Sequence, residues 1–205
     1  MTELSVKSGK GIRDGVVSEL AAFFRVKPGC EEQLREACAR FADSLRQVPE
    51  ADVQKIGLRD SRHVVFDDGT KLLWTTTFET DWDPYLDDAM LLFGVDNFIS
   101  WMRYIEEATE LTAWLNEAGG ADALRQPVEE RRNTVAQFGG GLKRIIQSVQ
   151  VPASGYYNAL ADQTVPQIRK AERVEQAFQK VLDDPAAEQA LASPALKPLL
   201  DEAAD

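Results

Sequence analysis

One stretch, residues 53–88, constrains the fold of this chain more than any other, because it reads as strand, tight turn, strand and the start of a helix. The turn F-D-D-G-T places Gly69 where a type I turn plus bulge needs a positive φ, with Phe66 opposite Thr70. Since side chains alternate along a strand, this register predicts one apolar and one polar face. The apolar face would carry Val64, Phe66, Leu72, Trp74, Thr76 and Phe78, and the polar face Arg59, Ser61, His63, Thr75, Thr77 and Glu79. A shift of one residue would move His63 to the apolar side.

Length and charge narrow the class of protein. With 205 residues, the chain is long enough for one domain and a helical appendage. A formal net charge of −11 repels phosphate groups, so neither nucleic acid nor an anionic membrane is expected as a partner. The first residues, M-T-E-L-S-V-K-S-G-K, contain no apolar signal segment, which predicts a cytoplasmic location. Cys30 and Cys38 would point about 80° apart on one helix, as free thiols.

The rest of the chain shows further strand and helix patterns. A strand is expected over residues 16–26, and K-P-G ends it before a helix over 30–47. After the hairpin, helices are expected over about 83–93, 98–108 and 109–118, followed by a short helix around 128–138 and a glycine hinge. A helix over about 142–151, a fourth strand over about 153–160 and a helical tail from Thr164 complete the chain.

This order predicts an α+β fold, namely a ferredoxin-like split βαβ antiparallel sheet with inserted helices and a helical C-terminal tail. Residues 1–15 would form a flexible arm, and residues 16–162 the sheet domain with a helical insertion over about 95–150. Residues 163–205 would form the tail and pack on the same domain. The sheet face without helices would be closed by a second copy of the chain, because Phe23 lies on it.

Two segments carry a resemblance to a known group of proteins. The passage F-R-V-K-P-G-C-E-E-Q-L resembles the first strand-to-helix passage of the dimeric α+β barrel superfamily, which includes antibiotic-biosynthesis monooxygenase-like domains, chlorite dismutases and dye-decolorising peroxidases. The segment L-L-W-T-T-T-F-E-T-D-W-D-P-Y-L-D-D is similar to a peroxidase-like group within it. The resemblance spans residues 16–94. It implies a homodimer with a ligand pocket between sheet and helices, but no single reaction.

The candidate site follows from the predicted polar face. His63, the one histidine, would serve as a catalytic acid or base, or as an axial ligand of haem; the cofactor itself stays unknown. Four aspartates, at 81, 83, 87 and 88, suggest helix caps and first-turn acids instead of a metal site. The expected substrate-binding residues are Arg25, Arg59, Thr75, Thr77, Glu79, Phe23 and Tyr157. The alternative for the charged residues is simple cross-strand pairing.

Two functions therefore stay open. The first is a small-molecule oxidoreductase, monooxygenase- or peroxidase-like, with its ligand on the open sheet face under the helices of residues 95–118. The second is a non-catalytic small-molecule-binding or accessory protein on the same fold. A third hypothesis is a structural protein that assembles through its helical tail.

Overall fold

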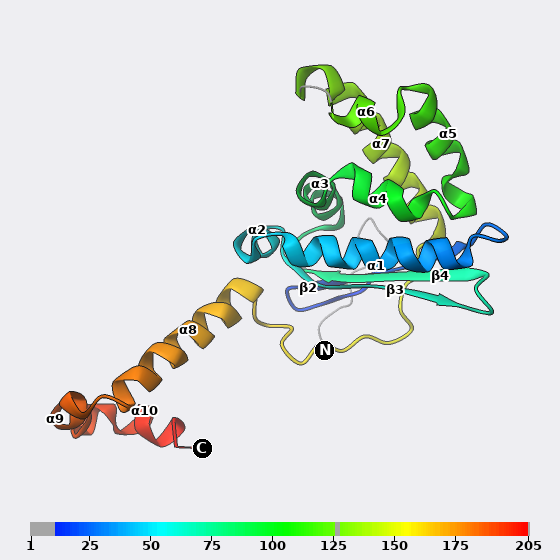
Figure 1. Cartoon of the computed structure of the whole chain (residues 1–205). Coiled ribbons are helices and arrows are strands. Elements are labelled where there is room, and N and C mark those ends of the chain that lie inside the picture. The colour runs from blue at the N-terminus through cyan, green and yellow to red at the C-terminus, as the bar shows by residue number, and fades with distance from the viewer. Residues whose placement is uncertain (1–10, 126–127, 205) are drawn as a thin grey trace. The chain divides into compact units, whose positions relative to one another are not determined.

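A computed structural model of the chain describes residues 11–125 and 128–204, and within them the side chains of all but residues 121, 124, 125, 128–133 and 135. It shows a mixed α+β protein with a four-stranded antiparallel sheet of order β1-β2-β4-β3 (Figure 1). The strands are β1 (Arg13–Asp14), β2 (Val17–Arg25), β3 (Leu58–Phe66) and β4 (Lys71–Phe78). The chain divides into two compact units, residues 1–164 and 165–205.

The first unit holds the sheet and most of the helices. Its helices are α1 (Glu31–Gln47), α2 (Glu50–Lys55), α3 (Trp82–Phe93), α4 (Val95–Met102), η1 (Glu106–Ala108), α5 (Thr109–Glu117), α6 (Gly120–Arg125) and α7 (Val128–Val149). Helices α1, α3 and α4 lie on one side of the sheet, and α5 to α7 lie beyond them on that side (Figure 1). The other face carries no helix within residues 11–125 and 128–164.

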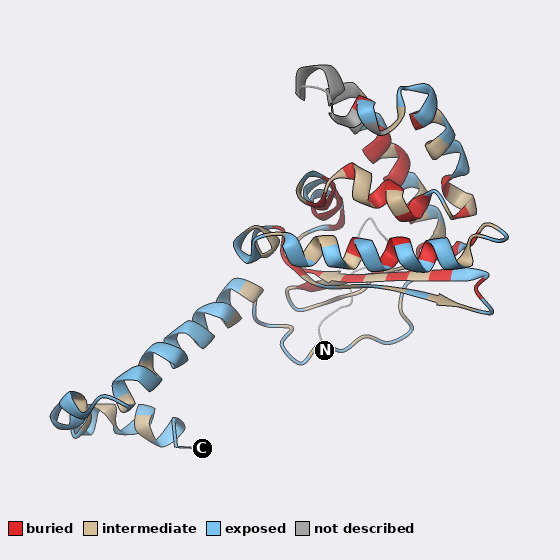
Figure 2. Cartoon of the chain, in the orientation of Figure 1, coloured by how far each residue is buried: buried red, intermediate tan, exposed pale blue. Residues whose placement is uncertain are grey.

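The core lies between the sheet and these helices, where Figure 2 shows most of the buried residues. Leu20, Phe24 and Trp74 from the strands are almost fully buried there, opposite Leu34 and Phe41 of α1. The alternation of these residues along β2 and β4, and their i, i+7 spacing in α1, explain why these segments form strands and a helix. Gly94 ends α3 with a φ of +83°, as its position after the apolar stripe predicts.

The second unit consists of α8 (Val165–Leu182), η2 (Pro185–Ala187), α9 (Glu188–Leu191), η3 (Pro194–Leu196) and α10 (Lys197–Glu202). None of its described residues is buried (Figure 2). The helix predicted from Thr164 and the two cap-then-proline turns are confirmed, and Asp184 accepts a hydrogen bond from the backbone N–H of Ala186. That the tail packs on the sheet domain stays a prediction.

The predicted register of the hairpin is wrong by one residue. Asp67 and Asp68 both adopt φ near +52°, and Gly69 follows at +87°, so the loop holds four residues and Phe66 pairs with Lys71 instead of Thr70. Consequently His63 lies opposite Trp74, on the face that α1 covers. A loop that starts with two left-handed residues resembles a type I′ turn, which the right-handed twist of paired strands favours.

Two further predictions fail downstream of the hairpin. Residues 151–163 contain no strand and run as coil past the face without helices, although Gln150 forms a single bridge with Ala22 of β2 (Figure 1). The predicted hinge at Gly139–Gly141 lies inside the continuous helix α7. The predicted arm 1–15 falls partly outside the described residues, but residues 13 and 14 form β1. No described helix is long and apolar enough to cross a membrane.

Candidate functional site

The open sheet face has a polar half and an apolar half. Glu19, Thr77 and Asp60 lie side by side across β2, β4 and β3 at the polar end. Towards the hairpin, Phe23, Leu73 and Val64 lie side by side in the same way. The helices of residues 95–118 lie on the opposite side of the sheet, so the expectation that they cover a ligand on this face is wrong (Figure 1).

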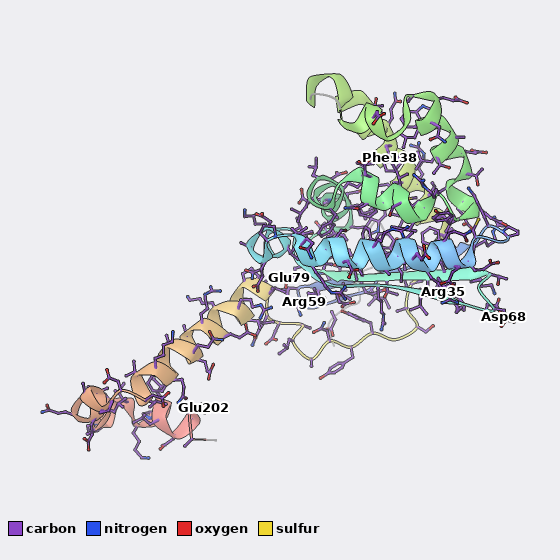
Figure 3. All side chains as sticks on the ribbon, viewed as in Figure 1. Arg35, Arg59, Asp68, Glu79, Phe138 and Glu202 are labelled. Atoms are coloured by element: carbon purple, nitrogen blue, oxygen red, sulfur yellow. The ribbon has the colours of Figure 1, made fainter. Side chains whose placement is uncertain are left out.

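Most of the predicted substrate-binding residues are already paired with other side chains. Arg59, the extra residue of a bulge in β3, forms an ion pair with Glu79, with Nε and Oε1 2.9 Å apart (Figure 3). Both side chains are about nine-tenths buried. Arg59 also donates hydrogen bonds to the backbone oxygens of Leu160 and Gln163. This pair therefore fastens the coil to the sheet, which favours a structural role for both residues.

The remaining members of the predicted set are similarly engaged. Thr75 accepts a hydrogen bond from Nε of Arg62, and Thr77 donates one to Asp60. Arg25 is exposed at the hairpin end, where its Nε lies 3.0 Å from Glu107 and 3.2 Å from Glu106. The carboxylate of Glu107 raises the pKa of Arg25. These contacts leave Arg25 far from the polar end of the face.

Tyr157 lies in the coil of residues 151–163 and not in a strand of this face. Its side chain is 83% exposed, whereas the neighbouring Tyr156 is half-buried and hydrogen-bonds to Asn158. Burial raises the pKa of Tyr156, and the carboxylates of Asp60 and Glu19 act in the same direction. Strand alternation could not distinguish the two tyrosines, because the segment that carries them is coil.

A groove of about 460 Å³ lies between α1 and the edge strand β3 on the other side of the sheet. We call it the His63 groove. Its lining includes Cys38, Phe41 and Leu45 from α1, and Ser61 and His63 from β3. Arg35 and Arg46, both exposed, line its rim. Arg46 forms an ion pair with Asp43, which leaves Arg35 as the rim cation that can meet a ligand. Its size falls within the range of small-molecule sites.

His63 forms part of this lining and is surrounded by aromatic rings. Its imidazole stacks on Trp74 at an angle of 6°, with ring centroids 6.0 Å apart. The edges of Phe41 and Trp101 approach it, with centroids 5.3 and 4.9 Å away. Nε2 is buried and has no hydrogen-bond partner among the described residues. Burial lowers the pKa of His63 to about 3, so the imidazole is neutral at physiological pH.

This environment limits the chemistry that the groove can support. An imidazole with a pKa near 3 is a weak general base at pH 7, where a useful base has a pKa close to the operating pH. Burial also raises the pKa of the Cys38 thiol to about 12, which keeps it protonated and poorly nucleophilic. Neither His63 nor Cys38 is therefore activated for general-base or thiolate catalysis at neutral pH.

Haem does not fit His63 in this environment. An axial ligand must offer a nitrogen with open space for iron and the porphyrin plane, but Nε2 of His63 is buried, and the rings of Phe41, Trp74 and Trp101 pack against the imidazole. In the part of the chain that the structure describes, no cluster of three histidine, cysteine or acidic side chains could hold a metal ion. Asp83 and Asp87 instead face Lys143, at 3.5 and 2.8 Å.

The sequence reasoning missed the His63 groove because it placed His63 on the wrong face. One signal was present, however. Two aspartates before a glycine permit consecutive left-handed residues, and the alternative register that they produce puts His63 beside Trp74. Comparisons with protein-family models, with curated proteins and with solved structures found no match.

Proposed function

We propose that this protein is a non-catalytic small-molecule-binding protein whose ligand occupies the His63 groove. The observation that carries the proposal is a neutral, unpaired imidazole at the wall of a 460 Å³ groove with apolar sides. The apolar side chains of Phe41 and Leu45 would contact the body of the ligand, and Arg35 at the rim favours an anionic or polar end. A ferredoxin-like sheet of the dimeric α+β barrel type is part of this proposal, supported by the strand order β2-β4-β3.

The proposal can be tested directly because His63 is the one histidine of the chain. We would label histidine with ¹⁵N and screen a library of small organic acids and neutral aromatics by NMR of the imidazole. Compounds bound in the groove should shift the His63 resonances. They should lose affinity at least tenfold in Ala42→Trp, which fills the groove, and keep it in Ala171→Trp, a substitution of equal size on exposed α8.

Two outcomes would contradict the proposal. Either no compound shifts His63, or the hits bind Ala42→Trp as well as the parent protein. An oxidoreductase, the alternative expected from the resemblance, would instead convert a bound compound and lose turnover in His63→Phe while its binding persists.

We also propose that the apolar half of the open face pairs with the same surface of a second copy. Phe23 and Val64 are 42% and 43% exposed on either side of Leu73, and the ring of Phe23 contacts Phe66 at 6.3 Å. A row of this kind is self-complementary under a twofold axis. Phe23→Lys should shift the mass in light scattering from dimer to monomer. Leu91→Lys, at a 75% exposed leucine of α3, is the control and should leave the mass unchanged. A monomeric parent protein would exclude this pairing.

A further inference from the structure

A second groove, of about 480 Å³, lies between α5 and α7 and is separate from the His63 groove. We call it the α5–α7 groove. Its walls include Leu111 and Trp114 from α5 and Ile145 from α7, all half-buried and packed on the core. Gly140 and Arg144, one turn apart on α7, also line the groove. The groove thus combines an apolar wall with one cation, Arg144, and two carboxylates, Glu107 and Glu110.

Three consecutive glycines of α7 lie beside this groove, and only the middle one, Gly140, leaves open space in it. A Cβ at Gly141 would stand 2.6 Å from Cδ1 of Leu111, and one at Gly139 would stand 3.1 Å from Cε of Met90, so these two glycines allow close helix packing. A Cβ at Gly140 would meet only Nη1 of Arg144, at 3.5 Å. Helix packing therefore does not require Gly140. Its effect is to leave open space in front of Arg144, although glycine weakens a helix by about 1 kcal/mol relative to alanine.

The charges around the groove indicate what it would hold. Arg144 is exposed, and no ion pair joins it to a carboxylate among the residues whose side chains are described. Glu107 is occupied by Arg25, whose backbone N–H and Nε both donate to it. Glu110 is exposed at the mouth and disfavours a second negative charge on a ligand. A guanidinium binds a carboxylate through two parallel hydrogen bonds, and an indole ring offers a flat surface for an aromatic ring.

We propose that the α5–α7 groove binds a small aromatic monocarboxylate. The ring would lie over Gly140 against Trp114 and Leu111, and the carboxylate would bind Arg144. The proposal is independent of the His63 groove, because the two grooves share no lining residue.

The experiment uses indole-3-acetate as the probe and indole-3-acetamide as its neutral counterpart, titrated into the full chain by calorimetry. We expect the acid to bind at least tenfold more tightly than the amide. Arg144→Gln should abolish that difference, and Gly140→Leu, which fills the space, should weaken both compounds at least tenfold. Arg40→Gln, at an exposed arginine of α1 outside both grooves, is the matched control and should change neither affinity.

Three results would overturn the proposal. The first is no saturable binding of the acid up to about 10 mM. The second is binding that persists unchanged in Gly140→Leu, and the third is an equal loss in Arg40→Gln, which would indicate general charge attraction. Circular dichroism and urea unfolding of each variant would establish that it is folded. If Ala42→Trp weakened binding of the acid and the α7 variants did not, the binding site would be the His63 groove.

Discussion

The neutral His63 leads to a specific dependence of stability on pH. Its pKa is about 3 in the folded protein and 6.5 in the unfolded chain, so below pH 6.5 the unfolded chain binds a proton that the folded protein excludes. The contribution of His63 to the free energy of unfolding is therefore complete above pH 6.5 and is lost as the pH falls towards 3. At about pH 4.5, two pH units at about 1.36 kcal/mol each give a loss of about 2.7 kcal/mol.

The assay is urea unfolding of the parent protein and of His63→Phe at about pH 7.5 and pH 4.5. Carboxylates titrate in both proteins, so the difference between their free energies of unfolding isolates His63. Phenylalanine keeps a planar ring against Trp74 and removes the buried nitrogen. When the pH is lowered from 7.5 to 4.5, the free energy of unfolding should fall by about 2.7 kcal/mol less in the variant than in the parent protein. This difference does not depend on the stability of the variant at pH 7.5. A stability difference between variant and parent that does not change with pH would refute the reasoning, as would a His63 pKa near 6 measured by NMR. His63→Leu serves as a second variant in case the phenylalanine packs poorly.

Three further predictions concern other parts of the first unit. Gly140→Ala should raise the free energy of unfolding by up to about 1 kcal/mol, whereas Gly141→Ala should lower it by about 1–2 kcal/mol because its Cβ would overlap Leu111. Urea unfolding of the two variants would measure these opposite changes. A higher stability of both variants would contradict the close packing of α5 on α7. Arg59→Ala should lower the free energy of unfolding by about 3–5 kcal/mol, because it leaves the buried carboxylate of Glu79 without this cation. It should also make residues 156–163 sensitive to limited proteolysis, and an unchanged cleavage pattern would contradict the role of Arg59 in holding this coil. In the folded protein a thiol reagent should modify half-exposed Cys30 first and Cys38 only after unfolding, and equal rates would contradict the raised pKa of the Cys38 thiol.

Local patterns were sufficient for the elements that bury one continuous stripe. The helix at residues 31–47 was predicted within one residue, and the strands at 17–25 and 71–78 were recognised from alternation alone. These elements have apolar residues at a single period, so packing and propensity favour the same structure. The same holds for α8, whose start after Thr164 and end before Pro185 follow from capping and proline geometry.

The candidate site was predicted only in part, because its residues are distributed by the register of the hairpin. Whether Asp67 and Asp68 adopt positive φ is a small energetic preference of the loop, but it moves His63 from one face of the sheet to the other. The observed register buries Val65 and His63 against α1, whereas the predicted register would bury Val64 and Phe66. The choice between the two depends on the helix and both strands together. No local pattern contains that information.

The amino-acid sequence by itself determined an acidic α+β protein with these strands, the long first helix and the helical tail, since short-range periodicity, caps and turn residues encode each of them. Only the tertiary structure decided which face His63 occupies, that residues 151–163 stay coil, and that three glycines continue a helix. Each of these depends on contacts between residues far apart in the chain: the aromatic rings around His63, the anchoring of the coil by Arg59, and the approach of Leu111 and Met90 to α7. Such contacts form only when the sheet and helices have already packed, which is why they override local preference.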